Sequence, residues 1–302
     1  MGAGLSTAAF REASKLLGVD ALGWFSATGF PQYLAVLEER REYHRIEYRT
    51  LEQFRAAARM PDWVVTVLVL VRDYFVGNEY AAGEYKLSNY SRACWQTVGP
   101  VTNRMLQFLR EKGVRAEQLN VPCRAAACRA GLGFIGRNGM FYAMDIGSYV
   151  GIAVIGVDVT IPEAGQGAER VLHPQCSTCG RCAEACPTGA IIQEGHGIYP
   201  LRCISFLNRH PDEPSCQMPA DPAALCGWLH GCEVCQNVCP LNTVIVHRPT
   251  PVSTPELDLY GMRVPNQASV SRAEIECRMS RVTSPGFREY LARLLSTAVP
   301  RG

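Results

Sequence analysis

The sequence predicts an α+β protein of two domains, in which a mixed helix-and-sheet domain precedes a smaller cysteine-rich one. Two apolar, β-branched runs have the length of buried strands, and segments with helical spacing lie around them. Ten of the 14 cysteines fall between Cys176 and Cys239. With 302 residues, 47% of them hydrophobic, the chain is long enough to build a core in each domain.

The first domain is expected to span residues 1–162. Its two predicted strands are Val64–Val71, with the sequence VVTVLVLV, and Ser148–Val159, with the sequence SYVGIAVIGVDV. Apolar side chains recur at helical spacing in three segments, at residues 5–18, 49–59 and Gly99–Lys112. This alternation predicts helices packed against a central sheet.

The second domain is expected to span residues 163–250. A polar connector, EAGQGAER, follows Pro162 and marks the boundary. Residues 251–302 begin with a segment rich in Pro and Thr and then show helical periodicity from Ser271 to Thr297. We therefore expect a C-terminal helical tail that packs back on the protein.

Charge and cysteine content narrow the functional classes. The formal net charge of +2 provides no general electrostatic footprint for nucleic acid. No window reaches the roughly 18 apolar residues of a membrane span, so we expect a cytoplasmic protein and no membrane partner. Because the cytoplasm keeps thiols reduced, the cysteines indicate metal or redox chemistry rather than disulfides.

Two cysteine motifs complement each other. The first, CSTCGRCAEACP at Cys176–Pro187, is the CxxCxxCxxxCP run of two-cluster ferredoxins, whose fourth cysteine ligates the other cluster. The second, CEVCQNVCP at Cys232–Pro240, supplies the reciprocal ligands. This exchange predicts two [4Fe-4S] clusters, the first held by Cys176, Cys179, Cys182 and Cys239, and the second by Cys186, Cys232, Cys235 and one more cysteine.

The missing ligand of the second cluster is predicted to be Cys203, with Cys226 and then Cys216 as alternatives. A zinc site is the alternative for the motifs as a whole, but three cysteines at two-residue spacing favour iron–sulfur. The other four cysteines are expected to be buried small hydrophobic residues; they are Cys94, Cys123, Cys128 and Cys277.

A GxGxxG pattern is formed by Gly131, Gly133 and Gly136, and Asp158 lies near the distance of a ribose-binding acid. A dinucleotide fingerprint must follow a strand, whereas the preceding PCRAAACRA is Ala-rich and helical in character. We therefore expect a turn in which the backbone makes a close approach.

Four ordered motifs resemble those of the epoxyqueuosine reductase family. RAGLGFIGRNGM at Arg129–Met140 is similar to the family signature AGLGxxGKN, with Arg137 in place of lysine. The CxxCxxCxxxCP run follows, then RCIS at Arg202–Ser205 and GCxxCQxxCPxN at Gly231–Asn242. Weaker similarity in ALGWFSATG and YAAGEY extends the resemblance toward the N-terminus.

The resemblance implies a nitroreductase-like, corrinoid-binding first domain, related to that of reductive dehalogenases, and cobalamin as an additional cofactor. It implies reduction of epoxyqueuosine to queuosine in tRNA, with electrons from a low-potential ferredoxin or flavodoxin. It also supports Cys203, which lies in RCIS, as the eighth cluster ligand. The signature residues implied to bind the corrinoid are Gly131, Gly133, Gly136, Arg137 and Asn138.

The chain departs from the family pattern near the implied substrate. An ungapped count from RAGLG places Glu117 where the family has its aspartate general acid, and Cys123 and Cys128 where acidic residues are usual. A solvated carboxylate is the alternative for Glu117. The chain ends at Gly302, whereas many members continue into a helical repeat extension, which weakens the expectation that tRNA is the partner. A dehalogenase-like corrinoid reductase and a non-catalytic electron-transfer protein remain alternative functions.

Overall fold

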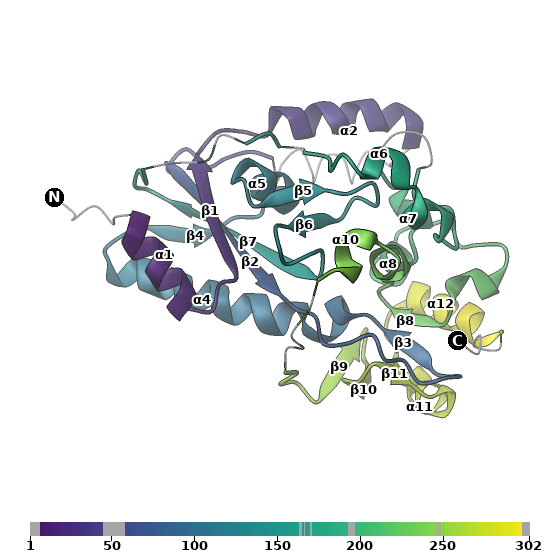
Figure 1. Cartoon of the computed structure of the whole chain (residues 1–302). Helices are drawn as coiled ribbons and strands as arrows, with labels where there is room; N and C mark the ends of the chain where they lie inside the picture. The colour runs from purple at the N-terminus through teal and green to yellow at the C-terminus, as the bar shows by residue number, and fades with distance from the viewer. Residues whose placement is uncertain are drawn as a thin grey trace. The chain divides into compact units, whose positions relative to one another are not determined.

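The computed structural model describes residues 7–44, 58–162, 165, 167–169, 171–192, 197–245, 247, 249 and 251–297 (Figure 1). The chain divides into two compact units. Unit 1 consists of Met1–Asp73, Thr97–Gly136 and Met140–Cys176, and unit 2 of Tyr74–Gln96, Arg137–Gly139 and Ser177–Gly302. Two segments from the first half of the chain therefore belong with the cysteine-rich half, which differs from the linear division expected at residue 162.

Unit 1 is built on a four-stranded antiparallel sheet in the order β1-β2-β7-β4. Its strands are β1 (Ala21–Ser26), β2 (Thr66–Asp73), β7 (Val150–Val157) and β4 (Ala116–Gln118). The two predicted strands are confirmed as β2 and β7, which pair with Val69 opposite Val154. Both are buried on both faces because helices cover the sheet on either side.

The helices of unit 1 lie on opposite faces of this sheet (Figure 1). Side chains alternate between the two faces along β1. The ring centre of Trp24 lies 6.4 Å from that of Phe10 in α1 (Thr7–Leu16), whereas the adjacent Phe25 belongs to the core formed with α5 (Cys123–Arg129). Phe10 also contacts Phe108 of α4 (Trp95–Glu111), so α1 and α4 share one face. Two of the predicted helices are thus confirmed. Most of the third, at 49–59, lies outside the described residues, and α2 (Pro31–His44) precedes it.

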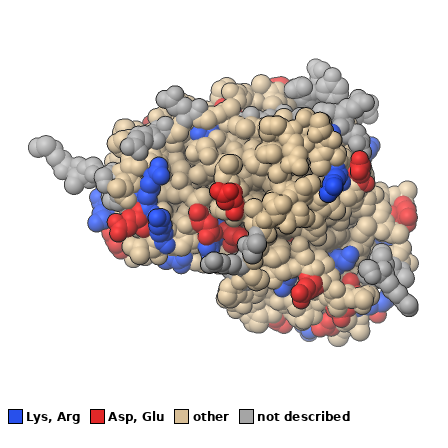
Figure 2. Space-filling view, viewed as in Figure 1, with Lys and Arg blue, Asp and Glu red and all other residues tan. Residues whose placement is uncertain are grey.

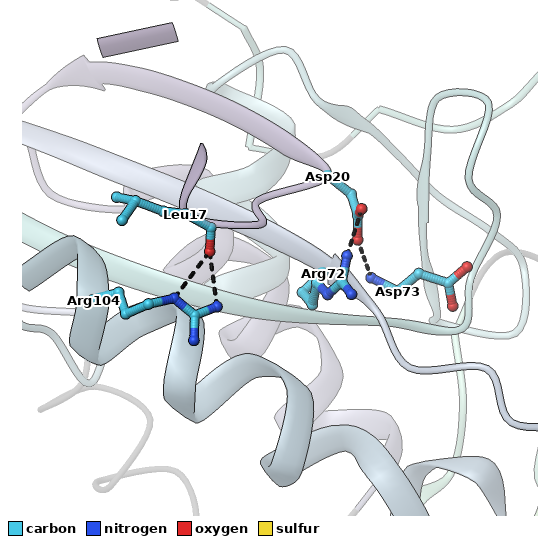
Figure 3. A network of polar contacts seen from close by, with 5 residues as sticks. All are labelled: Leu17, Asp20, Arg72, Asp73 and Arg104. Carbon is cyan, nitrogen blue, oxygen red and sulfur yellow. Dashed lines mark hydrogen bonds and ion pairs between the residues drawn. The ribbon is translucent and has the colours of Figure 1, made fainter. Parts of the chain in front are cut away.

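The connection between α1 and β1 is fixed by polar contacts (Figure 3). Arg104 of α4 donates to the carbonyl oxygen of Leu17 at 3.2 and 2.8 Å. Asp20 accepts from the Arg72 guanidinium at 2.8 Å and from the backbone N–H of Asp73 at 2.7 Å. These bonds tie the end of α1 to α4 and the start of β1 to the end of β2.

The GxGxxG segment forms a hairpin of β5 (Gly133–Ile135) and β6 (Phe141–Ala143) that follows α5. A Cβ atom added to Gly133 would lie 1.9 Å from the Tyr142 carbonyl oxygen, so this glycine is required by the close approach of the two strands. The order helix, turn, strand is not that of a dinucleotide fingerprint, which opens a helix after a strand. The expected turn with close backbone approach is confirmed.

Unit 2 contains a three-stranded sheet in the order β11-β3-β8 and a hairpin of β9 and β10. The strands are β3 (Tyr85–Leu87), β8 (Trp228–His230), β9 (Glu256–Leu259), β10 (Met262–Pro265) and β11 (Ser269–Val270). Because β3 comes from Tyr74–Gln96 and pairs in parallel with β8, backbone hydrogen bonds hold this segment in unit 2. The short π-helix η1 (Tyr90–Cys94) follows β3.

The residues after 250 complete the core of unit 2. Besides β9, β10 and β11 they form α11 (Arg272–Arg278), the 3₁₀ turn η4 (Met279–Arg281) and α12 (Pro285–Leu295). Phe287 and Leu291 of α12 are fully buried and share a hydrophobic cluster with Trp228 and Tyr85. The tail packs back as expected, but it is part strand and part helix.

Acidic and basic side chains are interspersed on the face shown in Figure 2, where the described residues form no large basic patch. Among the described residues, no helix has both the length and the apolar character needed to cross a membrane.

Candidate metal centre

The cysteine motifs and the cysteines between them lie on, or directly beside, helices of a single turn in the second half of the chain. These are α6 (Cys176–Cys179), α7 (Arg181–Glu184), η2 (Pro200–Arg202), α8 (Ile204–Leu207), η3 (Pro222–Leu225), α9 (Val234–Asn237) and α10 (Pro240–Thr243). Gly180 separates α6 from α7 with a φ of 68°, which a residue with a side chain rarely adopts, and Pro240 begins α10 directly after Cys239. Because each helix stops after one turn, the chain can present several thiols in a short stretch.

Five cysteines from three separate segments lie close enough to interact electrostatically. Burial is the largest influence on Cys232 and raises the pKa of its thiol, and three neighbouring thiols raise it further, those of Cys235, Cys203 and Cys186. Burial likewise raises the pKa of Cys235, followed by the thiols of Cys203, Cys182 and Cys186. Soft thiolates at this density suit iron–sulfur binding, since cluster iron would remove the repulsion among them.

The two alternative ligands have different surroundings. Cys226 lies in the left-handed region with a φ of 52°, beside Lys86 and Cys186. Cys216 contacts the carbonyl oxygen of His210 at 3.6 Å, and burial and then Glu213 raise its pKa to about 11. Cys203 raises the pKa of both Cys232 and Cys235, the two cysteines of CEVC. Cys226 and Cys216 are not among the thiols that do so.

The ligands predicted for the first cluster are divided between the units. Cys176 is the last residue of unit 1, whereas Cys179, Cys182 and Cys239 belong to unit 2. Among the residues that the structure describes, no three or more Cys, His, Asp or Glu side chains are arranged to hold a single metal ion. The iron–sulfur assignment therefore rests on motif spacing and on the family match reported below.

A buried carboxylate lies inside the second motif, and the motif analysis did not single it out. Glu233 is 1% exposed and accepts hydrogen bonds from Asn89 at 2.9 Å, from the Tyr80 hydroxyl at 3.2 Å and from the Tyr90 backbone N–H at 3.3 Å. Burial raises the pKa of Glu233, and these hydrogen bonds oppose that effect. The carboxylate thereby ties the segment Tyr74–Gln96 to the second motif.

A buried amide performs a similar task on the other side of the motif. Asn208 is fully buried, and its side chain accepts from the Gly231 backbone N–H at 2.9 Å and donates to the Gly231 carbonyl at 3.1 Å. It also donates to Tyr290, whose hydroxyl donates to the Trp228 carbonyl. Asn208 follows α8, so it joins the segment of Cys203 to the residue before Cys232. The sequence offers one signal for Glu233, its position between the two cysteines of CEVC, and none for Asn208.

Four of the five signature residues expected at a corrinoid have partners within the protein. Gly133 lies against the facing strand, and the Gly136 N–H donates to the Met140 carbonyl at 2.8 Å. Arg137 donates to the Ser177 carbonyl at 3.1 Å, and Asn138 contacts Cys235. Gly131, with a φ of 73°, has open space where a Cβ would be. Contacts within the protein are therefore enough to explain these four residues, and they do not by themselves indicate a corrinoid site. Corrinoid binding at this loop remains a prediction.

Glu117 lies on the exposed side of the edge strand β4, and its side chain is 53% exposed. Its carboxylate accepts from the Arg115 guanidinium at 2.9 Å, and that guanidinium lies 4.0 Å from the centre of the Trp63 ring. This is the environment of a solvated, ion-paired carboxylate. A catalytic role for Glu117 remains a prediction.

The cysteines outside the motifs divide into three kinds. Cys94 and Cys128 are buried, as expected. Cys123 is partly buried, whereas Cys277 is exposed, so the expectation of burial is wrong for Cys277. Its place on α11 explains this, because only Ile275 of that helix is buried.

The sequence matches the family described as "4Fe-4S double cluster binding domain" over residues 175–242, a range that contains all eight predicted ligands. An epoxyqueuosine reductase of Bacillus cereus is 31% identical over 266 residues, which cover 82% of this chain and 67% of the relative.

This chain belongs to the epoxyqueuosine reductase family.

An epoxyqueuosine reductase of Cellulophaga algicola is 28% identical over 206 residues, or 65% of this chain, and the alignment spans 64% of that relative, less than two thirds of its length. A solved structure of the Bacillus subtilis epoxyqueuosine reductase superposes with a TM-score of 0.66 at 21% identity, covering 95% of this chain and 80% of the other. The predicted family, the fold class and the two-cluster domain are therefore confirmed, and zinc is no longer needed as an alternative.

Proposed function

We propose that this member of the epoxyqueuosine reductase family reduces epoxyqueuosine to queuosine in tRNA and depends on cobalamin. The observation that carries the proposal is the 31% identity to the Bacillus cereus epoxyqueuosine reductase across 82% of the chain. Loss of the epoxide oxygen as water consumes two electrons and two protons. A double-cluster domain fits this demand because each cluster transfers one electron at a time.

The electrons are proposed to come from a low-potential ferredoxin or flavodoxin, and action on tRNA would place the protein in the cytoplasm. Bound cobalamin would supply the reducing metal that meets the epoxide, and the chain would supply positioning and protons. We propose that Cys176, Cys179, Cys182 and Cys239 hold the first cluster. Cys186, Cys203, Cys232 and Cys235 are proposed to hold the second, supported by the reciprocal spacing of the two motifs and by the closeness of Cys203 and Cys186 to both Cys232 and Cys235.

Glu117 is our candidate for the proton donor, supported by the ungapped count from the signature. Its carboxylate is half exposed and lies 2.9 Å from the Arg115 guanidinium, so it would have to leave this partner before it could reach a substrate.

The test uses the full chain, purified and reconstituted with iron and sulfide under anaerobic conditions. The protein is incubated with cobalamin and freed of unbound cofactor, and its absorption spectrum is recorded. It is then given reductant and tRNA that contains epoxyqueuosine, and the nucleosides are analysed by mass spectrometry. Retained cobalamin and conversion to queuosine are expected.

Two other outcomes would contradict the proposal in different ways. Retained cobalamin without conversion would favour a corrinoid reductase of another substrate, of the dehalogenase-like kind. Full clusters with no affinity for cobalamin would favour a non-catalytic electron-transfer protein.

A further inference from the structure

Trp95 is a large aromatic side chain that lies mostly in solvent. Of the four tryptophans in the sequence, Trp24 and Trp228 are buried. Trp63 is partly buried and has the Arg115 guanidinium over its ring. Trp95, by contrast, is 68% exposed. Because an indole has more apolar area than an aliphatic side chain, leaving it in water forgoes more hydrophobic free energy. Its ring is open to contact by a ligand.

A π-helical turn places Trp95 beside Tyr90. The π-helix η1 ends at Cys94, and α4 begins with Trp95 directly after it. Residues five apart lie about 140° apart around an α-helix, but nearly one above the other in a π turn, whose hydrogen bonds join residues i and i+5. The two ring centres are accordingly 6.4 Å apart in an edge-to-face arrangement. The same turn buries Arg92 and Cys94, so the irregular helix pairs two aromatic rings and leaves the second exposed.

Arg209, which lies two residues after α8, holds the Tyr90 ring in place. Its guanidinium carbon lies 4.2 Å from the ring centre, and the guanidinium donates to the Tyr90 hydroxyl at 3.1 Å. The buried Tyr74 ring packs edge-on against Tyr90, with the ring centres 5.8 Å apart. All of these residues belong to unit 2. We call Trp95, Tyr90 and Arg209 the aromatic platform: two fixed rings with a positive charge beside them.

This combination is the chemistry that binds unpaired nucleotides. Every base has a π-face, so any base can stack on an aromatic side chain, and arginine adds a cationic contact. An enzyme that acts on a base must reach it outside a duplex, and protein recognition of RNA favours single-stranded loops. Phosphate contacts alone are a limited source of affinity here, because the net charge is +2 and acidic and basic side chains are interspersed on the face in Figure 2. Stacking would supply affinity that the charges do not.

The size of the exposed apolar surface favours a base over a protein partner. A stable protein interface buries about 800 Å² on each side, with a cluster of anchoring side chains at its centre. Among the described residues of unit 2, the large hydrophobic side chains that are exposed are Trp95 and Val244. One indole ring matches the face of one base.

We propose that the aromatic platform binds an unpaired nucleotide of tRNA, with the indole of Trp95 stacked on the base. The contact serves recognition, and no bond is formed or broken in it. The proposal rests on the proposed function, because that function makes tRNA the substrate.

The experiment measures binding of fluorescein-labelled tRNA that contains epoxyqueuosine to the reconstituted full chain. Fluorescence anisotropy is recorded without reductant, so that no turnover occurs. Trp95→Ala removes the ring, whereas Trp95→Tyr keeps an aromatic face. We expect Trp95→Ala to raise the Kd at least about tenfold, the loss of one stacked base, and Trp95→Tyr to stay within about threefold of the wild type. Double-stranded RNA of the same length should bind the wild type and Trp95→Ala equally.

Val244→Ser is the matched control, because Val244 is the other exposed large hydrophobic residue among those described in unit 2. It should bind tRNA like the wild type. Equal affinities of the wild type and Trp95→Ala for tRNA, or an equal loss for double-stranded RNA, would overturn the proposal. Unchanged tRNA binding with slower reduction of the Trp95→Ala clusters by flavodoxin would also overturn it, and would assign the platform to the electron donor.

Tryptophan fluorescence tests the stacking itself. A base stacked on an indole quenches its emission, so tRNA should quench the wild type, and this quenching should be lost in Trp95→Tyr although that variant still binds. Full quenching in Trp95→Tyr would refute the stacking. Binding that depends on Trp95 without conversion to queuosine would overturn the proposed function and leave this inference standing. Conversion with binding that does not depend on Trp95 would do the reverse.

Discussion

The eighth cluster ligand is the sharpest test of the proposed metal centre. We expect Cys203→Ala to abolish the second cluster and Cys226→Ala to retain it. The physical reason lies in their neighbours. Cys203 lies close enough to raise the pKa of both Cys232 and Cys235, whereas the charged neighbours of Cys226 are Lys86 and Cys186. Four thiolates hold each [4Fe-4S] cluster in ferredoxin-type motifs, so we expect a cluster left with three protein ligands to be lost.

The magnitude follows from the stoichiometry. Two [4Fe-4S] clusters contain about eight iron and eight sulfide per chain, so loss of one leaves about four of each. In the dithionite-reduced wild type, two paramagnetic clusters interact and broaden each other's signals. Cys203→Ala should instead show the signal of one isolated cluster, integrating to about one spin per chain.

The assay is iron and sulfide analysis with spin quantification after anaerobic reconstitution of both variants in parallel. Cys226→Ala should keep about eight iron per chain and the wild-type spectrum. The reasoning is refuted if Cys203→Ala keeps eight iron while Cys226→Ala keeps four. A loss in neither variant would direct attention to Cys216, whose sulfur contacts the His210 carbonyl.

Three further outcomes test other parts of the structure. If Glu117 supplies the proton, Glu117→Gln should slow single-turnover reduction by at least about 100-fold while tRNA binding is unchanged; normal turnover would leave it a surface carboxylate. Gly133→Ala, whose Cβ would lie 1.9 Å from a carbonyl of the facing strand, should lower the free energy of unfolding by more than about 3 kcal/mol. Gly131→Ala, with open space but a φ of 73°, should cost about 1 kcal/mol, and equal melting temperatures would contradict the distinction. Iodoacetamide at pH 8 should modify the exposed Cys277 but not Cys128, because burial raises the pKa of Cys128 to about 11 and limits access; labelling of Cys128 in the mass spectrum would argue against this packing.

Much of the protein could be predicted from local sequence. The strands β2 and β7 are apolar runs whose residues are buried on both faces, so composition alone marks them. The cysteine motifs encode their chemistry in spacing, because single helical turns bounded by Gly and Pro set where consecutive thiols point. Even the rejection of a dinucleotide site depended only on the Ala-rich segment before Gly131.

Other features depend on contacts between residues far apart in the chain. Asn89 and Glu233 are separated by 144 positions and Asn138 and Cys235 by 97, and no periodicity reports such pairs. The membership of Tyr74–Gln96 in unit 2 likewise follows from pairing of β3 with β8 and from a buried carboxylate that needs donors. Local sequence was enough to predict the two clusters, which the family match confirms, and to propose their ligands, because the motif cysteines are close together in the chain. The buried polar groups around the second cysteine motif could be identified only once the fold was known, since burial and hydrogen bonding arise when distant segments meet.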